Sequence, residues 1–295
     1  MSGILGVTLV GMEAQPVEIE VGIVSGLFSI SIVGMPGKAV RESKDRVSAA
    51  LREVGVTLKG KVSVNLAPAD IPKEGSLLDL PIALGMVSGY GLLSNFPKSI
   101  CIGELGLDGR LKRVRGVVPA AFLARKLDLP LYVPKENASE VALVKGVKAF
   151  GVESLAELLQ IFLGEIKPEP IETVTAQDLP ALIETDFADI KGQSTAKRAA
   201  EIAAAGHHNL LLVGSPGSGK TMIAKAIAGI LPPLTDEELI ETLLVRSTVG
   251  IPSKPGARKT VQTGSLQRKH CFSLRRRKQF APGRSLACAS RRVIS

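Results

Sequence analysis

The sequence predicts an α+β domain followed by an incomplete α/β P-loop domain. Residues 1–165 mix strand and helix patterns without a strict β-α repeat, and residues 214–221 match a phosphate-binding loop. Only 74 residues follow this loop, and they contain no apolar run that ends in Asp-Glu, the Walker B pattern. We therefore expect a nucleotide site that lacks part of the machinery for hydrolysis.

The domain boundaries follow from the patterns along the chain. Alternation of apolar and polar residues predicts strands at 17–21, 28–33 and 62–66. Helical spacing predicts helices at 39–54, 78–93, 120–126 and 153–163. Residues 166–187, with Pro168, Pro170 and several acidic residues, are predicted to be a linker. The P-loop fragment then covers residues 188–250, and a basic tail covers residues 251–295.

The P-loop lies between an apolar strand at 209–213 and a helix at 221–230 that Pro232 and Pro233 end. In such a loop the glycines let backbone N–H groups surround phosphates, the lysine reaches the β and γ oxygens, and the threonine hydroxyl ligates Mg²⁺. The predicted site residues are Gly214, Ser215, Pro216, Gly217, Ser218, Gly219, Lys220 and Thr221, with Thr221 as the metal ligand. Residues 236–238 are acidic and are predicted to open the next helix.

Composition narrows the class of protein. The chain has no run of 18 apolar residues and no signal peptide, so we expect a cytoplasmic protein without membrane contact. Its three cysteines and three histidines lack the spacing of a metal or redox site, and His207 and His208 are predicted to lie in a loop or cap. Residues 246–295 hold 13 basic and no acidic residues, which leaves a net charge of −4 on residues 1–245.

Several segments carry a resemblance to a known family. They are residues 33–37, 65–75, 189–193, 201–209 and 229–234, together with the P-loop. Over residues 1–250 the chain resembles the YifB/ComM family, the magnesium-chelatase-like AAA+ proteins.

The resemblance implies a front domain similar to the Lon protease catalytic domain, a rear AAA+ ATPase domain and assembly into a homo-hexamer. It also implies ATP and Mg²⁺ as cofactors and DNA as a partner, since the ComM type is a DNA helicase that drives branch migration in natural transformation. Ile190 and Gln193 would lie beside the adenine. The alternative is that Ile190 is a core residue and Gln193 a polar residue at a helix start.

The residues argue against proteolysis. Where the Lon nucleophile is expected the chain has Leu77, and the position expected for its lysine is Ala120, so there is no activated nucleophile. Ser76 is then a helix N-cap or a loop hydroxyl. Lys73 and Glu74 are predicted to form a solvated turn.

The basic tail departs from the family, and two explanations remain open. A family segment that precedes Walker B, translated in a shifted frame, gives the residues found at 283–294, which indicates a frameshift between residues 246 and 259 and a disordered tail. The other explanation is a genuine basic arm that binds DNA phosphates through residues 275–278.

The leading functional hypothesis is an ATP-binding member of this family that lacks hydrolysis. Two alternatives stay open: the ATPase subunit of a metal chelatase, and a non-catalytic module that docks to a partner through its Lon-like domain.

Overall fold

The computed structural model describes residues 4–93, 96–174, 185–232, 235–250, 262–266 and 269–273. Residue contacts divide the chain into two units, 1–180 with 234–257 and 181–233 with 258–295. This division differs from the predicted boundaries at 165, 188 and 250. The Ile171 and Val174 amides donate to carbonyls of the first unit, and the helix at 236–249 also belongs with that unit. The domain boundaries of the protein stay a prediction.

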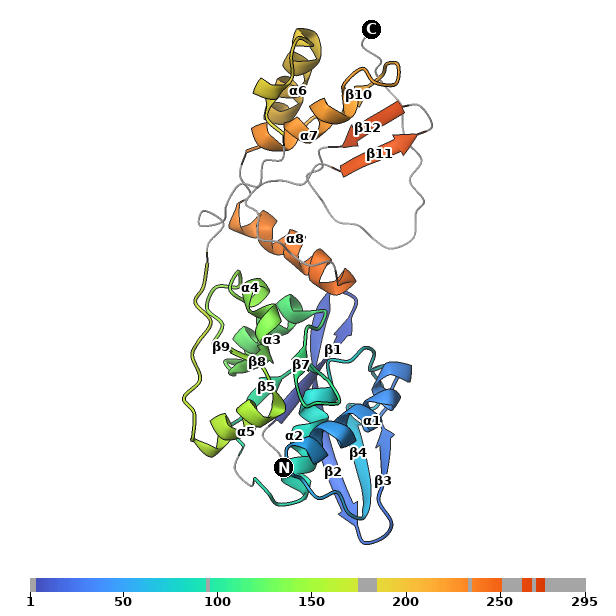
Figure 1. Ribbon diagram of the computed structural model, residues 1–295, viewed down its shortest axis with the longest axis vertical. Coiled ribbons are helices and arrows are strands. Elements are labelled where there is room, and N and C mark those ends of the chain that lie inside the picture. Colours follow the sequence, from blue (N-terminus) through green and yellow to red (C-terminus); the bar gives the residue numbers. More distant parts are fainter. Residues whose placement is uncertain are drawn as a thin grey trace. The chain divides into compact units, whose positions relative to one another are not determined.

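A seven-stranded mixed sheet forms the centre of the first unit (Figure 1). β2 pairs antiparallel with both its neighbours, and all other neighbouring strands are parallel. In spatial order the strands are β3 (Ser29–Val33), β4 (Lys61–Ala67), β2 (Glu13–Val24), β1 (Ile4–Val10), β5 (Ser99–Cys101), β8 (Leu131–Pro134) and β9 (Ala149–Val152). The predicted mixture of strands and helices is confirmed as a mixed α/β sheet.

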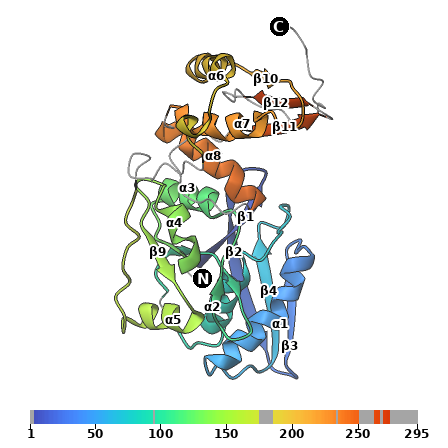
Figure 2. The same ribbon diagram turned by 45° about the horizontal axis from the view of Figure 1, so that its top comes forward.

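Helices cover both faces of this sheet. Successive strand residues point to opposite sides, so a single strand contributes side chains to both cores. One core contains Ile4 and Tyr132, and the other contains Val7 and Val133. The helices of the first core are α1 (Lys38–Glu53), α2 (Asp79–Gly89) and α5 (Leu155–Leu163); those of the second are α3 (Val117–Leu127), α4 (Ala138–Val141) and α8 (Asp236–Val249). Figure 2 shows α1 beside β3 and β4, and α5 beside β9.

The predicted helices are confirmed with small shifts. α2 ends at Gly89, four residues earlier than predicted, whereas α3 begins three residues earlier. α5 begins after Ser154, whose hydroxyl accepts a hydrogen bond from the Glu157 amide. α2 lies close to the sheet, since a Cβ on Gly85 would stand 2.7 Å from Ile19 Cγ2.

A buried carboxylate joins α1, α2 and the short ribbon of β6 (Glu104–Leu105) and β7 (Leu111–Lys112). Asp79 is fully buried and accepts hydrogen bonds from Arg46 Nε at 2.6 Å, from the Ser43 hydroxyl and from the Leu105 amide at 3.2 Å. The bond to Asp79 raises the pKa of Arg46 above its ordinary value. This network fixes the N-terminal half of α1 against the start of α2.

The prediction of a solvated turn at Lys73 and Glu74 is wrong for Lys73. Its side chain is fully buried, and its ammonium donates to the carbonyl oxygen of Pro68. Backbone hydrogen bonds from Lys73 N to Met35 O and from Gly37 N to Lys73 O tie this segment to the residues before α1. The segment therefore packs into the fold, while Glu74 remains exposed.

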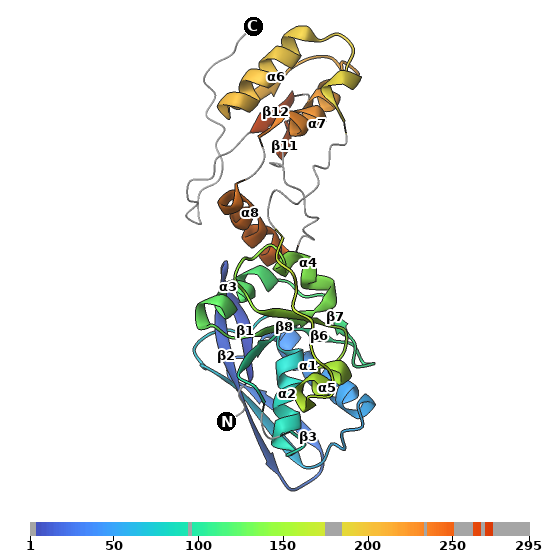
Figure 3. The same cartoon turned by 90° about the vertical axis from the view of Figure 1, so that its left-hand side faces the viewer.

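The second unit has a small core. It contains the one-turn helix η3 (Phe187–Asp189), α6 (Ser194–Gly206), β10 (Leu210–Leu212), α7 (Lys220–Ile230), β11 (Gln262–Leu266) and β12 (Lys269–Ser273). α6 and α7 pack together, as Figure 3 shows, and half of the buried residues of this core are alanines. The predicted strand at 209–213 is confirmed as β10, and the predicted helix at 221–230 as α7.

Two strands lie within the predicted basic tail. β12 pairs antiparallel with both β10 and β11, so residues 262–266 and 269–273 belong to a sheet. The segments used to argue for a frameshift or for a basic arm at residues 275–294 lie outside the described residues. In the part of the chain that is described, no helix has the length and apolar character needed to cross a bilayer.

Candidate nucleotide-binding site

The predicted P-loop connects the end of β10 to the start of α7. The Ser218 amide donates to the Ser215 carbonyl at 3.3 Å, which closes a four-residue turn. Pro216 follows the first residue of this turn, and Gly217, with φ of 80°, comes next. Pro followed by a residue of positive φ is the pattern of a type II turn, and glycine adopts that φ without strain.

Lys220 folds back over the loop that precedes it. Its ammonium donates to the Ser215 carbonyl at 2.6 Å and to the Ser218 hydroxyl at 3.1 Å. Both partners are neutral oxygens, so a phosphate oxygen can replace them and form a stronger, charge-assisted bond. The loop thus holds the lysine beside the position where an anion would bind.

The start of α7 is suited to the same anion. Gly219 is its N-cap with φ of 81°, no side chain caps the helix, and its first turn contains no acidic residue. The first amides of a helix have no partner within it and carry the positive end of the helix dipole. Thr221 is exposed in this first turn, where its hydroxyl can ligate a metal held by the phosphates. These residues fit a magnesium-bound phosphate chain.

The two residues proposed to lie beside the adenine differ in their surroundings. Gln193 is exposed, and its side-chain amide donates to the Ser218 carbonyl at 3.5 Å, so the fold brings it to the P-loop. Ile190 is buried in the core of the second unit. The structure is thus compatible with the alternative reading of Ile190 as a core residue, and binding of adenine by either residue stays a prediction.

The other candidate residues show no catalytic arrangement. Leu77 and Ala120 are buried apolar side chains, and Ser76 is a loop residue because the N-cap of α2 is Leu78. His207 is the C-cap of α6, in agreement with the predicted cap role. Burial raises the pKa of the Cys101 thiol to about 12, so it is not a thiolate at neutral pH. In the described ranges no three His, Cys, Asp or Glu side chains gather into a metal site.

Sequence reasoning missed how Lys220 is held. The motif identifies Ser218 only as a variable position, but its hydroxyl contacts the lysine ammonium. A Cβ on Gly214 would lie 3.0 Å from the same hydroxyl, so this glycine leaves room for it. The only signal for this contact in the sequence is a serine two residues before the lysine. That signal does not tell whether the serine hydroxyl binds a ligand or the lysine of the same loop.

Two family models match the chain. One, described as subunit ChlI of Mg-chelatase, matches residues 19–137, and another, described as magnesium chelatase, subunit ChlI, matches residues 186–273. Together they cover most of the first unit's sheet and the whole P-loop.

Several curated proteins are similar to this chain. The competence protein ComM of Haemophilus influenzae is 42% identical over 245 residues, which are 81% of this chain and 48% of that protein. An uncharacterized protein, YifB of Escherichia coli, is 37% identical over 249 residues, 82% of this chain and 48% of that protein. The DNA repair protein RadA of Streptococcus pneumoniae is 26% identical over 110 residues, 37% of this chain and 26% of that protein. The chain spans about half the length of the first two relatives.

Proposed function

From the premise that this chain belongs to the magnesium-chelatase-like family that includes ComM and YifB, we propose that its second unit binds ATP with Mg²⁺ at residues 214–221. The observation that carries the proposal is the position of Lys220, which is held by neutral oxygens beside the uncapped start of α7. Lys220 binds the β and γ phosphates, and Thr221 ligates Mg²⁺. Gln193 contacts the nucleotide from the loop before α6, and Ile190 supports it from the core.

The proposal covers binding of the nucleotide and does not extend to its hydrolysis. Hydrolysis also requires an acidic ligand for Mg²⁺, a group that orients water and an arginine from a neighbouring subunit. The described residues of the loop supply none of these groups.

Binding is tested with a fluorescent ATP analogue and Mg²⁺, by fluorescence anisotropy of the full chain. Lys220→Ala is expected to weaken binding by at least about tenfold, because a hydrogen bond to a charged group contributes about 1.5–3 kcal/mol. Lys225→Ala is the matched control, since Lys225 is an exposed lysine on the same helix outside the loop. Thr221→Ala is expected to remove the part of the affinity that depends on Mg²⁺.

Two results would contradict the proposal. One is the absence of saturable binding by the unsubstituted chain, and the other is equal loss of affinity in the Lys220 and Lys225 variants. Equal loss would indicate a general effect of positive charge instead of a specific contact with phosphate.

For the whole protein we extend the proposal to ATP-driven work on DNA by a cytoplasmic homo-hexamer. The name of one relative, the DNA repair protein RadA, supports a link to DNA. Helicase or branch-migration activity is then the finer hypothesis. The link to DNA is tested by measuring whether DNA changes the affinity for the nucleotide, since coupling between two ligands is reciprocal.

The ATPase subunit of a metal chelatase is the second candidate. The descriptions of both family models favour it, and one of these models matches the front half of the chain as well. The two candidates differ in ligand: a chelatase subunit would respond to its partner subunits and a tetrapyrrole, whereas a DNA-dependent ATPase would respond to DNA. The remaining hypothesis is a Lon-like docking module formed by residues 1–165, which a pull-down with intact copies of a relative tests.

A further inference from the structure

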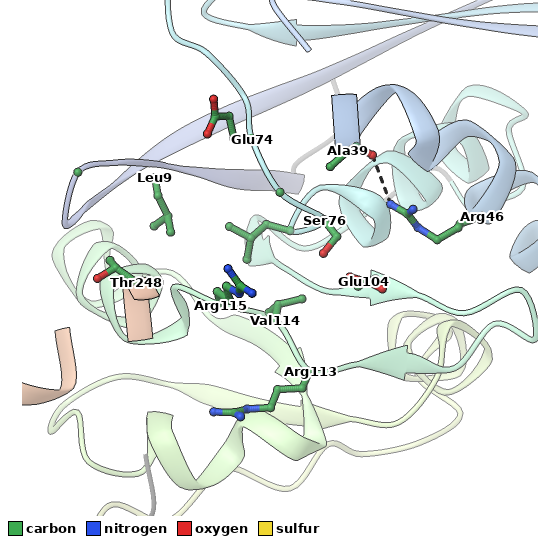
Figure 4. A pocket seen from close by; sticks show the side chains of 13 residues that line it. Leu9, Ala39, Arg46, Glu74, Ser76, Glu104, Arg113, Val114, Arg115 and Thr248 are labelled. Atoms are coloured by element: carbon green, nitrogen blue, oxygen red, sulfur yellow. Dashed lines mark hydrogen bonds between the residues drawn. The ribbon is translucent and has the colours of Figure 1, made fainter. Parts of the chain in front are cut away.

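The first unit contains a cavity of about 740 Å³ at the ends of several elements (Figure 4). This volume is in the range of sites for small molecules. Its charged lining consists of three arginines and two glutamates: Arg46, Arg113, Arg115, Glu74 and Glu104. Its apolar lining is aliphatic, from Leu9, Leu77 and Val114.

The three arginines differ in how their charges are balanced. Arg46 binds the buried carboxylate of Asp79, and Arg113 binds Glu140, whose side chain is 3% exposed. Among the described residues, Arg115 forms no hydrogen bond and no ion pair. Within the described ranges, Arg115 is therefore the arginine of this lining that no carboxylate binds directly.

Buried groups fix the backbone from which Arg115 projects. The Asn137 side chain is fully buried, accepts from the Val114 amide at 3.0 Å and donates to the Val114 carbonyl at 3.0 Å. On its other side, Arg115 packs against the end of α8, where a Cβ on Gly250 would stand 2.3 Å from Arg115 Nε. These contacts hold the backbone next to Arg115 in place, while the Arg115 residue itself is exposed to solvent.

The cavity wall adds further positive potential and a second donor. Ala39, in the first turn of α1, and Leu77, just before α2, line the cavity, and neither helix has a side-chain cap. The hydroxyl of Ser76 also lines it and, in the described part of the chain, takes part in no hydrogen bond. An anion near Ala39 would meet the positive end of the α1 dipole, since the first turn of α1 contains no acidic residue. The start of α2 does not add to it, because its first turn contains Asp79 and its Leu80 amide already donates to the Gly103 carbonyl.

We propose that this cavity is a second ligand site, independent of the P-loop, which binds a small organic oxyanion. Arg115 pairs with the anionic group, which is a phosphate ester or a carboxylate, and Ser76 donates a hydrogen bond to it. The aliphatic wall of Leu9 and Leu77 contacts the carbon part of the ligand. Glu74 and Glu104 select ligands that carry a hydroxyl or amine at the other end.

Calorimetric titration of the full chain tests this site, with glycerol 3-phosphate and 4-aminobutyrate as separate probes for the two classes of oxyanion, since each carries a hydroxyl or an amine at its other end. The chain carries Lys220→Ala throughout, so that the P-loop contributes little to the signal. Saturable binding of at least one probe is expected, and the tighter probe identifies the class. Adding Arg115→Gln is expected to weaken binding by at least about tenfold. Ser76→Ala is expected to weaken it by a smaller factor.

Arg110→Gln is the matched control, because Arg110 is an exposed arginine on the turn between β6 and β7 that does not line the cavity. Its affinity for the probe is expected to stay unchanged. Circular dichroism melts of all variants establish that they fold alike. Absence of saturable binding of both probes at millimolar concentration would overturn the proposal, as would equal affinities in the Arg115 and Arg110 variants. If Arg115→Gln does not fold, Ser76→Ala decides, and unchanged affinity in that variant overturns the proposal.

Discussion

Lys73 shows how a single buried cation makes stability depend on pH. Its side chain is fully buried, and burial lowers the pKa of its ammonium below the ordinary value of 10.5, while the charge of Asp70 opposes that shift. Between the two pKa values the unfolded chain binds more protons at this residue than the folded chain does. The contribution of Lys73 to stability therefore rises with pH across that window and stays constant at lower pH, where both states bind the proton.

Replacement of this lysine by a neutral side chain of similar length removes that dependence. We expect the free energy of unfolding of the natural chain, relative to Lys73→Met, to increase as the pH rises towards 10.5, because the folded-state pKa lies below that value. Urea unfolding at several pH values measures it. For Lys38→Met, at a lysine whose side chain is 93% exposed, the difference is expected to stay nearly constant. Parallel curves for the natural chain and Lys73→Met would contradict this explanation.

The site residues that could be predicted are those that lie close together in the sequence. The P-loop from Gly214 to Thr221 follows from residue types at a fixed spacing, and the structure places those residues on one turn and one helix start. Gln193 lies 25 positions before Ser218 in the sequence, and only the packing of the second unit brings the two together. Contacts of this kind have no periodic signal in a single sequence.

At the scale of elements, the strands that were predicted have one face in water. β4 alternates between exposed or half-buried and fully buried residues, which is the pattern that reveals a strand. β5 and β8 are buried along their whole length, and β9 at both ends, so these strands carry no complete alternation and were missed. Helix starts were more accessible to prediction, since the capping box of Thr235 and Glu238 lies at the acidic segment 236–238.

α8 is attached to α3 through one buried serine. The Gly116 amide donates to the Ser247 carbonyl at 2.9 Å, and the Val118 amide donates to the Ser247 hydroxyl at 3.3 Å. Since Gly116 is the N-cap of α3 and has no side chain, Ser247 supplies the oxygen that a capping side chain would provide. Leu239 and Leu243 on the same helix are buried in the core beside α3.

Loss of this hydroxyl is expected to destabilise the first unit. Ser247→Ala leaves the Val118 amide without its acceptor in a buried position, which costs about 1–2 kcal/mol. Urea unfolding followed by circular dichroism measures the change. Ser48→Ala serves as a control, because the Ser48 hydroxyl donates only to the Lys44 carbonyl within α1 and alanine favours helix. If both variants have the same stability, the attachment of α8 does not depend on this cap.

At the scale of the whole molecule, the two units have cores of very different composition. The two cores of the first unit contain many buried Leu, Ile and Val side chains on both faces of its sheet. Five of the ten described buried residues in the second unit's core are alanines, which remove little apolar surface from water. The second unit therefore has much less hydrophobic stabilisation, and a ligand at the P-loop would contribute a larger share of its stability.

We expect the units to unfold in separate transitions, with the second unit first. Magnesium-bound ATP at about 100 times its dissociation constant should stabilise that first transition by about 2.7 kcal/mol and leave the other unchanged. Hydrogen exchange at increasing urea concentration measures this, with peptides from α7 and β2 as reporters of the two units. In Lys220→Ala the α7 transition is expected not to respond to nucleotide. One transition shared by both peptides would contradict independent units. In that case the small alanine-rich core would unfold together with the large core, and its stability would depend on the large core.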